Sequence, residues 1–301
     1  MDQWNTETAG ISGRTGLICL LGSPVSHSIS PAMHNEAFRL LGLDYRYLAF
    51  DVGEDVLPAA VEGLKALGAC GWNLTMPDKS RMAKLCDKLS PAARLTGSVN
   101  TVVNDHGVLT GHTTDGYGYM ESIRQAGFGP EGKTMTLLGG GGAAVAVCTQ
   151  AALDGMKEIR VFNRKGRSLS RMDEMAERLK KASSCRIISC DLADQESLSA
   201  SIRESDILTN ASSVGMGRDP DDADACLIRE PQMLHPGLIV SDLIYEPRQT
   251  RLLRMAEAQG CRTLNGLYML LYQGAAAFQL WTGERMPVDR IREKFFSSRV
   301  S

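Results

Sequence analysis

Short apolar runs and amphipathic stretches alternate along the amino-terminal part of the chain. Residues 16–21 form an apolar run that predicts a buried strand. Ser30 and Pro31 predict a helix that Ser30 caps and in which Pro31 takes the first helical position, with Gly42 as the stop. Further strands are expected at residues 45–52 and 71–76, and further helices at residues 56–67 and 80–89.

The same alternation resumes after Lys133. Residues 134–138 predict a strand, residues 139–142 are a run of glycines, and residues 143–153 predict a helix. Further strands are expected at residues 158–162, 186–189, 207–209 and 238–243, and further helices at residues 172–181 and 195–202. Strands that alternate with helices are typical of parallel sheets, so the sequence predicts an α/β fold.

Composition and charge narrow the class of protein. The chain has 301 residues, of which 43% are hydrophobic and 23% are charged, and this suits a globular protein of two domains. Its net charge of −2 provides no overall field that would attract nucleic acid or an anionic membrane. The eight cysteines form no C-x-x-C pair and predict reduced thiols in a cytoplasmic protein without a metal site.

Three segments bear on location and exposure. The amino terminus lacks the basic start and apolar run of a secretory signal. Residues 267–281 are apolar but too short to span a bilayer, and they include Gln273, so they predict a buried helix. Residues 217–225, GRDPDDADA, predict an exposed acidic loop.

The glycine run carries a dinucleotide-binding pattern. Gly139, Gly141 and Ala144 match G-x-G-x-x-A between a predicted strand and a predicted helix. The first glycine permits a tight turn, the second lets backbone approach a pyrophosphate, and the helix N-terminus offers N–H groups to the phosphates. A plain glycine-rich turn is the alternative.

The end of the next strand predicts which nucleotide binds. NAD sites usually place Asp or Glu here to bind the ribose hydroxyls, and neither occurs between Arg160 and Ser170. Arg164, Lys165 and Arg167 instead supply three cations that match the 2′-phosphate of NADP. The alternative is a solvated basic turn with NAD as the cofactor.

Polar clusters also lie outside the dinucleotide region. They are residues 26–35 (SHSISPAMHN), residues 73–79 (NLTMPDK), and residues 97–101 (GSVNT) with residues 113–116 (TTDG). The first two follow predicted strands, where ligands of open α/β sheets bind. Each cluster also has a structural explanation, with Ser30 as a helix cap, Lys79 as a surface lysine and Asn100 as a turn residue.

Taken together, these segments resemble the shikimate dehydrogenase family from about Ile18 to about Trp281. The matching segments, in order, are GSPVSHSISPAMHNEAF, NLTMPDK, GSVNT, TTDGYG, LLGGGGAA, FNRK, NASSVGM, DLIYEP and GLYMLLYQGAAAF. KTMTLLGGGGAAVA and DLADQES are closer to the quinate/shikimate dehydrogenase branch. The resemblance implies a parallel-type α/β substrate-binding domain over residues 1–117, rejoined by residues 264–301, and a Rossmann-like NAD(P)-binding domain over residues 118–263.

The resemblance also implies an activity and roles for individual residues. The activity is reversible NADP-dependent oxidation of shikimate to 3-dehydroshikimate, a step toward chorismate and the aromatic amino acids. Lys79 and Asp115 are implied to be the catalytic pair. The implied substrate-binding residues are Ser28 and Ser30 for the carboxylate, and Thr75, Asn100, Asp115, Tyr245 and Gln273 around the ring and the nicotinamide. The implied cofactor-binding residues are Gly139, Gly140, Gly141, Gly142, Ala143, Asn163, Arg164, Lys165, Arg167, Ser212, Gly215, Met216 and Gly266.

The chemistry independently requires a base, because a hydroxyl that loses hydride from its carbon must also lose its proton. A lysine serves if its pKa is lowered or if proton loss is coupled to hydride departure. An adjacent carboxylate orients the ammonium group but also tends to raise its pKa. Thr113 stands where the family usually has Asn, so the pattern of substrate hydroxyls that the site accepts is expected to differ. GGGG replaces GAGG, so the glycine turn is also expected to differ.

Several alternatives stay open at this point. Quinate, with NAD or NADP, is the closest alternative to shikimate. An aminoshikimate-type paralogue is a second, and a nucleotide-sensing binding module without turnover is a third, against which Lys79 and Asp115 argue. The assembly is open between a monomer and a homodimer.

Overall fold

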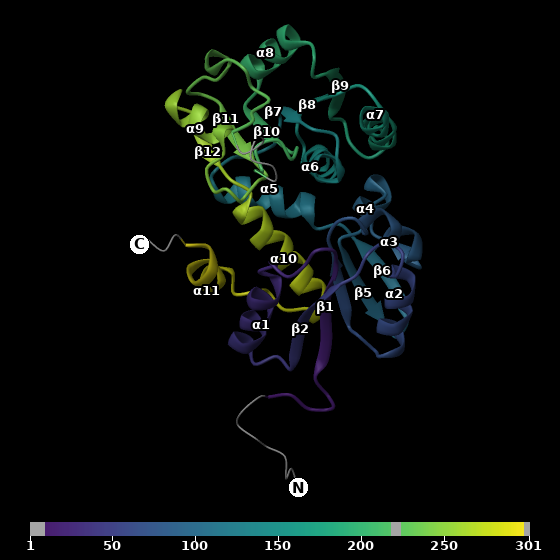
Figure 1. Cartoon of the computed structure of the whole chain (residues 1–301). Helices are drawn as coiled ribbons and strands as arrows, with labels where there is room; N and C mark the ends of the chain where they lie inside the picture. The colour runs from purple at the N-terminus through teal and green to yellow at the C-terminus, as the bar shows by residue number, and fades with distance from the viewer. Residues whose placement is uncertain (1–9, 218–223, 298–301) are drawn as a thin grey trace. The chain divides into compact units, whose positions relative to one another are not determined.

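The chain forms two compact units, each built on a six-stranded sheet, in a computed structural model that describes residues 10–217 and 224–297 (Figure 1). One unit reaches to Thr114 and resumes at Gly274, and the other spans Asp115–Gln273. We expected boundaries after residues 117 and 263. The first observed division, after Thr114, lies just before helix α5, and the second, after Gln273, lies inside helix α10 (Leu267–Thr282).

The sheet of the first unit is mixed. Its strand order is β2-β1-β3-β5-β6-β4. The strands are β1 (Gly16–Gly22), β2 (Tyr45–Asp51), β3 (Gly71–Leu74), β4 (Lys88–Leu89), β5 (Thr101–Asp105) and β6 (Val108–His112). Strand β1 pairs in parallel with β2 and β3, whereas β5 pairs antiparallel with β3 and β6. The start of β5 consequently lies beside the end of β3.

Helices cover both faces of this sheet. They are α1 (Ser30–Leu41), α2 (Leu57–Ala66), α3 (Lys79–Leu85), α4 (Pro91–Thr96), the end of α10, α11 (Val288–Ile291) and the π-helix η2 (Arg292–Phe296). Side chains alternate between the faces of a strand, so Cys19 and Trp72 pack with α2 and α3. Tyr47 lies on the other face, where its ring is 4.5 Å from His34 of α1 and 6.0 Å from Trp281 of α10.

Helix α1 begins one residue earlier than the sequence predicts. Its N-cap is Ile29, which makes no side-chain cap bond, and Ser30 is the first helical residue, so the prediction that Ser30 caps the helix is wrong. Pro31 tolerates the first turn because it lacks the N–H group that would be unpaired there. The predicted stop is confirmed, since Gly42 adopts the left-handed conformation with φ of 65°.

The second sheet has the strand order β12-β11-β10-β7-β8-β9, and its pairings are parallel. The strands are β7 (Thr134–Leu138), β8 (Glu158–Asn163), β9 (Arg186–Asp191), β10 (Ile207–Asn210), β11 (Ile239–Asp242) and β12 (Arg262–Leu264). This is the doubly wound order of dinucleotide-binding folds, in which the direction of winding reverses between β7 and β10.

Among the described residues, six helical segments accompany this sheet besides α10. They are α5 (Asp115–Gln125), α6 (Gly142–Leu153), α7 (Arg167–Leu179), α8 (Gln195–Glu204), the 3-10 helix η1 (Pro231–Met233) and α9 (Arg251–Ala258). Helix α5 packs closely on two others. A Cβ at Gly116 would lie 2.3 Å from the carbonyl of Ala146 on α6, and one at Gly118 would lie 2.5 Å from the backbone nitrogen of Gln273 on α10. These contacts fix the first turn of α5, which begins with Asp115.

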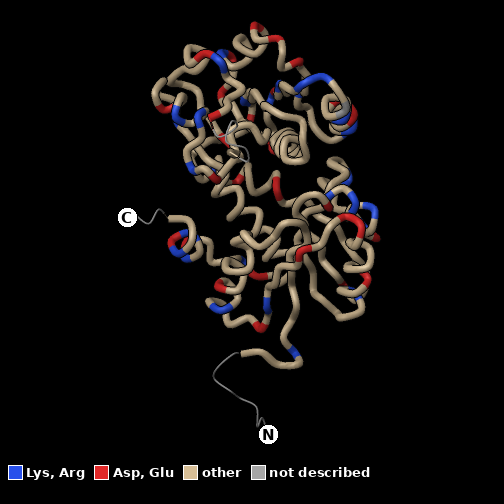
Figure 2. The backbone as a smooth tube through the Cα atoms, viewed as in Figure 1, with Lys and Arg blue, Asp and Glu red and all other residues tan. Residues whose placement is uncertain are grey.

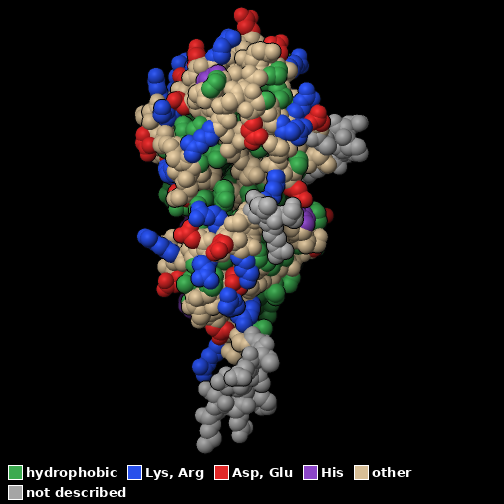
Figure 3. Space-filling view, turned by 90° about the vertical axis from the view of Figure 1, so that its left-hand side faces the viewer, with side chains coloured by type: hydrophobic (Ala, Val, Ile, Leu, Met, Phe, Trp, Pro, Cys, Tyr) green, Lys and Arg blue, Asp and Glu red, His purple; other side chains and the backbone are tan. Residues whose placement is uncertain are grey.

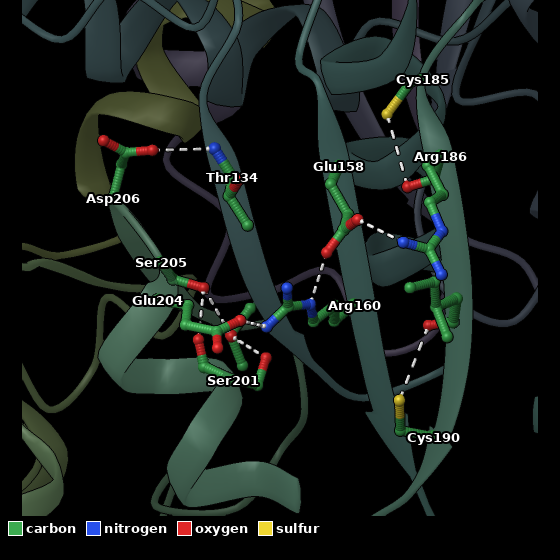
Figure 4. A network of polar contacts seen from close by, with 12 residues as sticks. Thr134, Glu158, Arg160, Cys185, Arg186, Cys190, Ser201, Glu204, Ser205 and Asp206 are labelled. Carbon is green, nitrogen blue, oxygen red and sulfur yellow. Dashed lines mark hydrogen bonds and ion pairs between the residues drawn. The ribbon is translucent and has the colours of Figure 1, made fainter.

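An ion-pair network joins the outer strands of the second sheet (Figure 4). Glu158 of β8 accepts from Arg160 at 2.5 Å and from Arg186 of β9 at 3.1 Å. Arg160 also reaches Glu204 of α8 at 2.6 Å. The Glu158 carboxylate is buried and needs such partners. The network therefore holds β9 against β8.

Charge and polarity are distributed over both units. Acidic and basic residues are interspersed along the backbone (Figure 2), and the face drawn in Figure 3 also mixes both signs. Within residues 10–217 and 224–297, no helix has the length and hydropathy needed to cross a bilayer. All eight cysteines are free thiols. Most of the predicted acidic loop, at residues 218–223, lies outside the described ranges.

Candidate active site

One edge of the first sheet gathers the predicted substrate-binding segments. Backbone hydrogen bonds join them: Leu74 N–H donates to the carbonyl of Asn100 at 2.9 Å, and Val99 N–H donates to that of Lys79 at 3.0 Å. Thr75 N–H donates to the carbonyl of Leu21 at 2.9 Å. The antiparallel direction of β5 is what brings the Asn100 segment to the ends of β1 and β3.

A chain of buried hydrogen bonds runs through this edge. The Tyr47 hydroxyl donates to Asn73 Oδ1 at 2.7 Å and is also hydrogen-bonded to Ser30. Asn73 Nδ2 donates to the carbonyl of Asn100 and to Thr101 Oγ1, both at 3.0 Å. All five residues are buried. Burial raises the pKa of Tyr47 well above its usual value, so its hydroxyl keeps its proton and donates.

The side chain of Asn100 is hydrogen-bonded through both its amide nitrogen and its amide oxygen. Its Nδ2 donates to Thr114 Oγ1 at 2.9 Å, and its Oδ1 accepts from Thr114 N–H at 2.7 Å. Thr114 is the last residue of the first unit, and Asp115 follows it as the first residue of α5. The hydrogen bonds that fix Asn100 therefore also fix the backbone that leads into Asp115.

Lys79 begins α3, directly after a buried carboxyl group. Asp78 is fully buried, and its two carboxyl oxygens have no hydrogen-bond partner among the described residues. Burial raises the pKa of Asp78, and the neighbouring charge of Glu54 raises it further. The Val99–Lys79 backbone hydrogen bond anchors the first turn of α3, which begins with Lys79.

Ser28 and Ser30 lie where α1 begins. The backbone N–H of Ser30 donates to Ser28 Oγ at 3.2 Å, so the two residues form one turn. Ser28 is half-buried and Ser30 is buried. His34, one helical turn further on, is fully buried and stacks on the Tyr47 ring, and this burial lowers the pKa of His34 to about 3.

In the second unit, the glycine run forms the turn from β7 into α6. Gly139 has φ of 111°, which side chains rarely adopt, and a Cβ there would lie 2.9 Å from the carbonyl of Ala211. A Cβ at Gly140 would lie 2.3 Å from Asn163 Nδ2, so the alanine usual in the family would displace Asn163. A Cβ at Gly141 or Gly142 would meet open space, and this turn leads into the N-terminus of α6, a type of helix end that favours anionic groups such as phosphates.

The ends of β10 and β11 form a second polar cluster. Asn210 Nδ2 donates to Asp242 Oδ1 at 3.0 Å, and Thr250 Oγ1 donates to Asp242 Oδ2 at 2.7 Å. Burial raises the pKa of Asp242 to about 6. Asn210 Oδ1 in turn accepts from the hydroxyl of Ser212 at 2.7 Å. This cluster shapes the loops that carry Gly215, Met216 and Tyr245, the last of which is partly exposed.

Gly266 and Gln273 lie at the start and in the middle of α10. The N–H of Gly266 donates to the carbonyl of Ile244 at 3.1 Å, which ties it to the same loop. Gln273 Nε2 donates to the carbonyl of Leu270 at 3.0 Å. Because the backbone of Gln273 contacts Gly118, this residue lies beside the helix that Asp115 begins.

A pocket of about 510 Å³ lies beyond the ends of β8 and β9. It is lined by Arg164, Lys165, Asp191, Leu192, Ala193, Gln195, Cys226, Leu227 and Arg229. Lys165 Nζ lies 3.2 Å from Asp191 Oδ2. Asp191 and Arg229 were not among the predicted site residues, because they come from other strands and loops. The side chain of Arg167 lies outside the described part of the chain.

The predicted residues thus fall into two groups, one in each unit. Ser28, Ser30, Thr75, Lys79 and Asn100 belong to the first unit. The second unit holds Asp115, Tyr245, Gln273 and the residues predicted to bind the cofactor. Lys79 belongs to the first unit, and Asp115, the other member of the predicted catalytic pair, is the first residue of the second.

Comparisons with known proteins match both units. The family profile "Shikimate dehydrogenase substrate binding domain" matches residues 20–102, and "Shikimate 5'-dehydrogenase C-terminal domain" matches residues 266–294. Shikimate dehydrogenase (NADP(+)) of Listeria monocytogenes is 52% identical over 292 residues, 97% of this chain and 99% of that protein. Quinate/shikimate dehydrogenase of Escherichia coli is 42% identical over 283 residues, 94% of this chain and 97% of that protein.

A solved structure agrees in fold. The crystal structure of shikimate 5-dehydrogenase from Listeria monocytogenes, in complex with shikimate and NAD, matches with a TM-score of 0.90 and 52% identity. The match covers 95% of this chain and 98% of that chain. With sequence identity and fold in agreement over nearly the whole length, the chain belongs to the shikimate dehydrogenase family.

Proposed function

We propose that this protein catalyses the reversible NADP-dependent oxidation of shikimate to 3-dehydroshikimate. The observation that carries the proposal is the buried hydrogen-bond chain that holds Ser30 and Asn100 at the sheet edge where Lys79 begins α3. Such fixed polar groups suit a small polyol carboxylate, whose hydroxyls must be recognised one by one. The Listeria monocytogenes relative is named for this activity.

In this proposal the carboxylate of the substrate is bound by the hydroxyls of Ser28 and Ser30. No Arg or Lys occurs between Arg14 and Arg39, so this loop holds the anion without a basic side chain of its own. Thr75, Asn100 and Gln273 bind ring hydroxyls. Hydrogen bonds from neutral donors to a carboxylate are strong enough for this role, at ~1.5–3 kcal/mol each.

Lys79 and Asp115 carry the proton transfer. Lys79 takes the proton of the hydroxyl under oxidation as hydride leaves the same carbon, and Asp115 orients that hydroxyl and the lysine. NADP, when bound, supplies the hydride acceptor. In the reverse direction Lys79 returns the proton to the carbonyl oxygen.

The phosphates of the cofactor fit the glycine turn. The α6 N-terminus is open above Gly141 and Gly142, and Asn163 packs against Gly140 at the end of β8. Arg164 is exposed in the pocket beyond β8, where it suits a 2′-phosphate. Tyr245, Ser212, Gly215 and Met216 line the nicotinamide side in this proposal.

Quinate is the second candidate substrate, because the 42% identical relative from Escherichia coli is named quinate/shikimate dehydrogenase. We also propose a cytoplasmic location, which the eight free thiols support. A monomer or a homodimer stays a prediction that light scattering on the purified protein would resolve.

Absorbance of the reduced nicotinamide tests the proposal with shikimate and quinate, each against NADP and NAD. We expect the highest kcat/KM with shikimate and NADP. A higher kcat/KM with quinate would reassign the substrate. Nucleotide binding without turnover of either substrate would instead support the binding-module alternative.

A further inference from the structure

The pocket beyond β8 and β9 contains a carboxylate that the basic sequence around Arg164 does not reveal. Asp191 ends β9, and its register partner on β8 is Asn163, the residue directly before Arg164. The ion-pair network of Glu158 and Arg186 holds these two strands together at their other end. Asp191 is therefore a fixed part of the pocket wall.

The local contacts of Asp191 leave it ionised and oriented. Its Oδ1 accepts from Ala193 N–H at 3.0 Å, and its Oδ2 lies 3.2 Å from Lys165 Nζ. The Ala193 hydrogen bond and the Lys165 ammonium lower the pKa of Asp191. About a quarter of the side chain is exposed, at 26%, so a ligand in the pocket can reach it.

The charge of the pocket is therefore more balanced than the sequence predicts. Lys165 is engaged with Asp191, whereas Arg164 and Arg229 form no ion pair with any residue in the described ranges. A 2′-phosphate would gain from both arginines but would meet the Asp191 carboxylate and compete with it for Lys165. A free ribose 2′-hydroxyl would meet an acceptor instead of a repelling charge.

We propose that Asp191 is a specificity-determining residue that limits the preference for NADP and keeps NAD usable. The inference rests on the proposed function in taking this pocket as the site of the adenosine ribose. Asp191 acts in two ways: it withholds Lys165 from the 2′-phosphate, and it offers Oδ2 to the 2′-hydroxyl of NAD. Arg164 and Arg229 act in the opposite direction, because their positive charges favour the 2′-phosphate of NADP.

Asp191→Asn removes the negative charge but keeps the local hydrogen bond, because the amide oxygen can still accept from Ala193 N–H. Asp194→Asn is the matched control. Asp194 lies on the same loop, is exposed, and caps α8 by accepting from Ser197 N–H at 3.0 Å, but it does not line the pocket. A nonspecific effect of losing one negative charge would change the nucleotide preference equally in both variants. A contact inside the pocket would change it only in Asp191→Asn.

The measured quantity is the ratio of kcat/KM with NADP to kcat/KM with NAD, at saturating shikimate. We expect Asp191→Asn to raise this ratio about fivefold or more, by lowering KM for NADP and raising KM for NAD with little change in kcat. Asp194→Asn should change it less than about twofold. Lys165→Met should move the ratio the opposite way, toward NAD.

Calorimetric Kd values for both nucleotides on the same variants keep the test independent of turnover. If shikimate is not oxidised but the Kd ratio shifts as expected, the proposed substrate is wrong and the role of Asp191 stands. An unchanged ratio in Asp191→Asn, or equal shifts in Asp191→Asn and Asp194→Asn, would overturn the proposal. A structural role alone would weaken both nucleotides equally, which also contradicts it.

Discussion

Removal of the Tyr47 hydroxyl tests the buried hydrogen-bond chain of the first unit. Tyr47→Phe keeps the ring and its stacking on His34 but leaves Asn73 Oδ1 without the donor that now lies at 2.7 Å. Asn73 is only 5% exposed, so water cannot easily replace that donor. An unpaired buried acceptor costs ~1–3 kcal/mol, and we expect the free energy of unfolding to fall by this amount.

Tyr45→Phe is the matched control. Tyr45 lies on the same strand, and its hydroxyl makes no hydrogen bond to a residue in the described part of the chain. Its loss should therefore change the free energy of unfolding by less than ~0.5 kcal/mol. Urea unfolding followed by tryptophan fluorescence suits the comparison, because the buried Trp72 and Trp281 belong to the same unit.

The same variant should also weaken substrate binding. Ser30 loses a hydrogen-bond partner, and the Asn73 bonds that hold the Asn100 backbone lose their support. We expect KM for shikimate to rise severalfold with a smaller change in kcat. If Tyr47→Phe matches both the wild type and Tyr45→Phe in stability and in KM, the chain does not organise the site.

Three further predictions concern the carboxylate site, the buried histidine and the basic turn. The double variant Ser28→Ala, Ser30→Ala should lose ~3 kcal/mol or more of shikimate binding free energy in calorimetry, while Ser26→Ala on the same loop stays near wild type; equal affinities would refute the assignment. His34 has a pKa of about 3 in the folded protein against 6.5 in the unfolded chain, so only the unfolded chain takes up a proton as pH falls below 6.5. This contribution lowers the free energy of unfolding by ~1.4 kcal/mol per pH unit, and His34→Leu should remove that part of the slope between pH 6.5 and 5; parallel slopes for the two proteins would contradict it. Arg164→Ala should raise KM for NADP about fivefold and leave KM for NAD nearly unchanged, whereas Arg171→Ala on α7 should alter neither; equal effects on both nucleotides would mean that Arg164 does not meet the 2′-phosphate.

The sequence predicts the second unit more completely than the first, because its strands are apolar runs and its glycine turn has a recognisable pattern. Strand β7 has the predicted bounds, and α6 begins one residue earlier than predicted. The fold class and the family are confirmed by the comparisons. Helix α9 and strand β12 were not predicted, since they are short, at eight and three residues.

The hairpin of β5 and β6 was not predicted from the sequence, and this omission mattered most for the site. A two-residue turn joins the strands, in which His106 and Gly107 have positive φ values of 49° and 91°. Asn104 Oδ1 accepts from Gly107 N–H at 2.8 Å and supports the turn. The glycine after short β-branched stretches was a usable signal for a hairpin. Without it, the reason why Asn100 joins the ends of β1 and β3 was not evident.

Contacts between distant segments account for the remaining differences. Asp191 meets Lys165 only because β9 pairs with β8 in one particular register. The sequence around Arg164 shows three cations and no acid, and local sequence cannot show a carboxylate that the neighbouring strand supplies. The buried pairing of Tyr47 with Asn73 depends likewise on the order of strands in the sheet.

The turnover of a Lys79 variant tests the central claim most directly. Lys79→Ala should lower kcat for shikimate oxidation by ~100-fold or more, the usual scale for loss of a general acid–base group, with a smaller change in KM. Lys84→Ala is the control, because Lys84 is exposed in the last turn of the same helix and should leave kcat within about twofold. If Lys79→Ala keeps a kcat close to that of the wild type and of Lys84→Ala, Lys79 does not transfer the proton and the proposed mechanism is wrong.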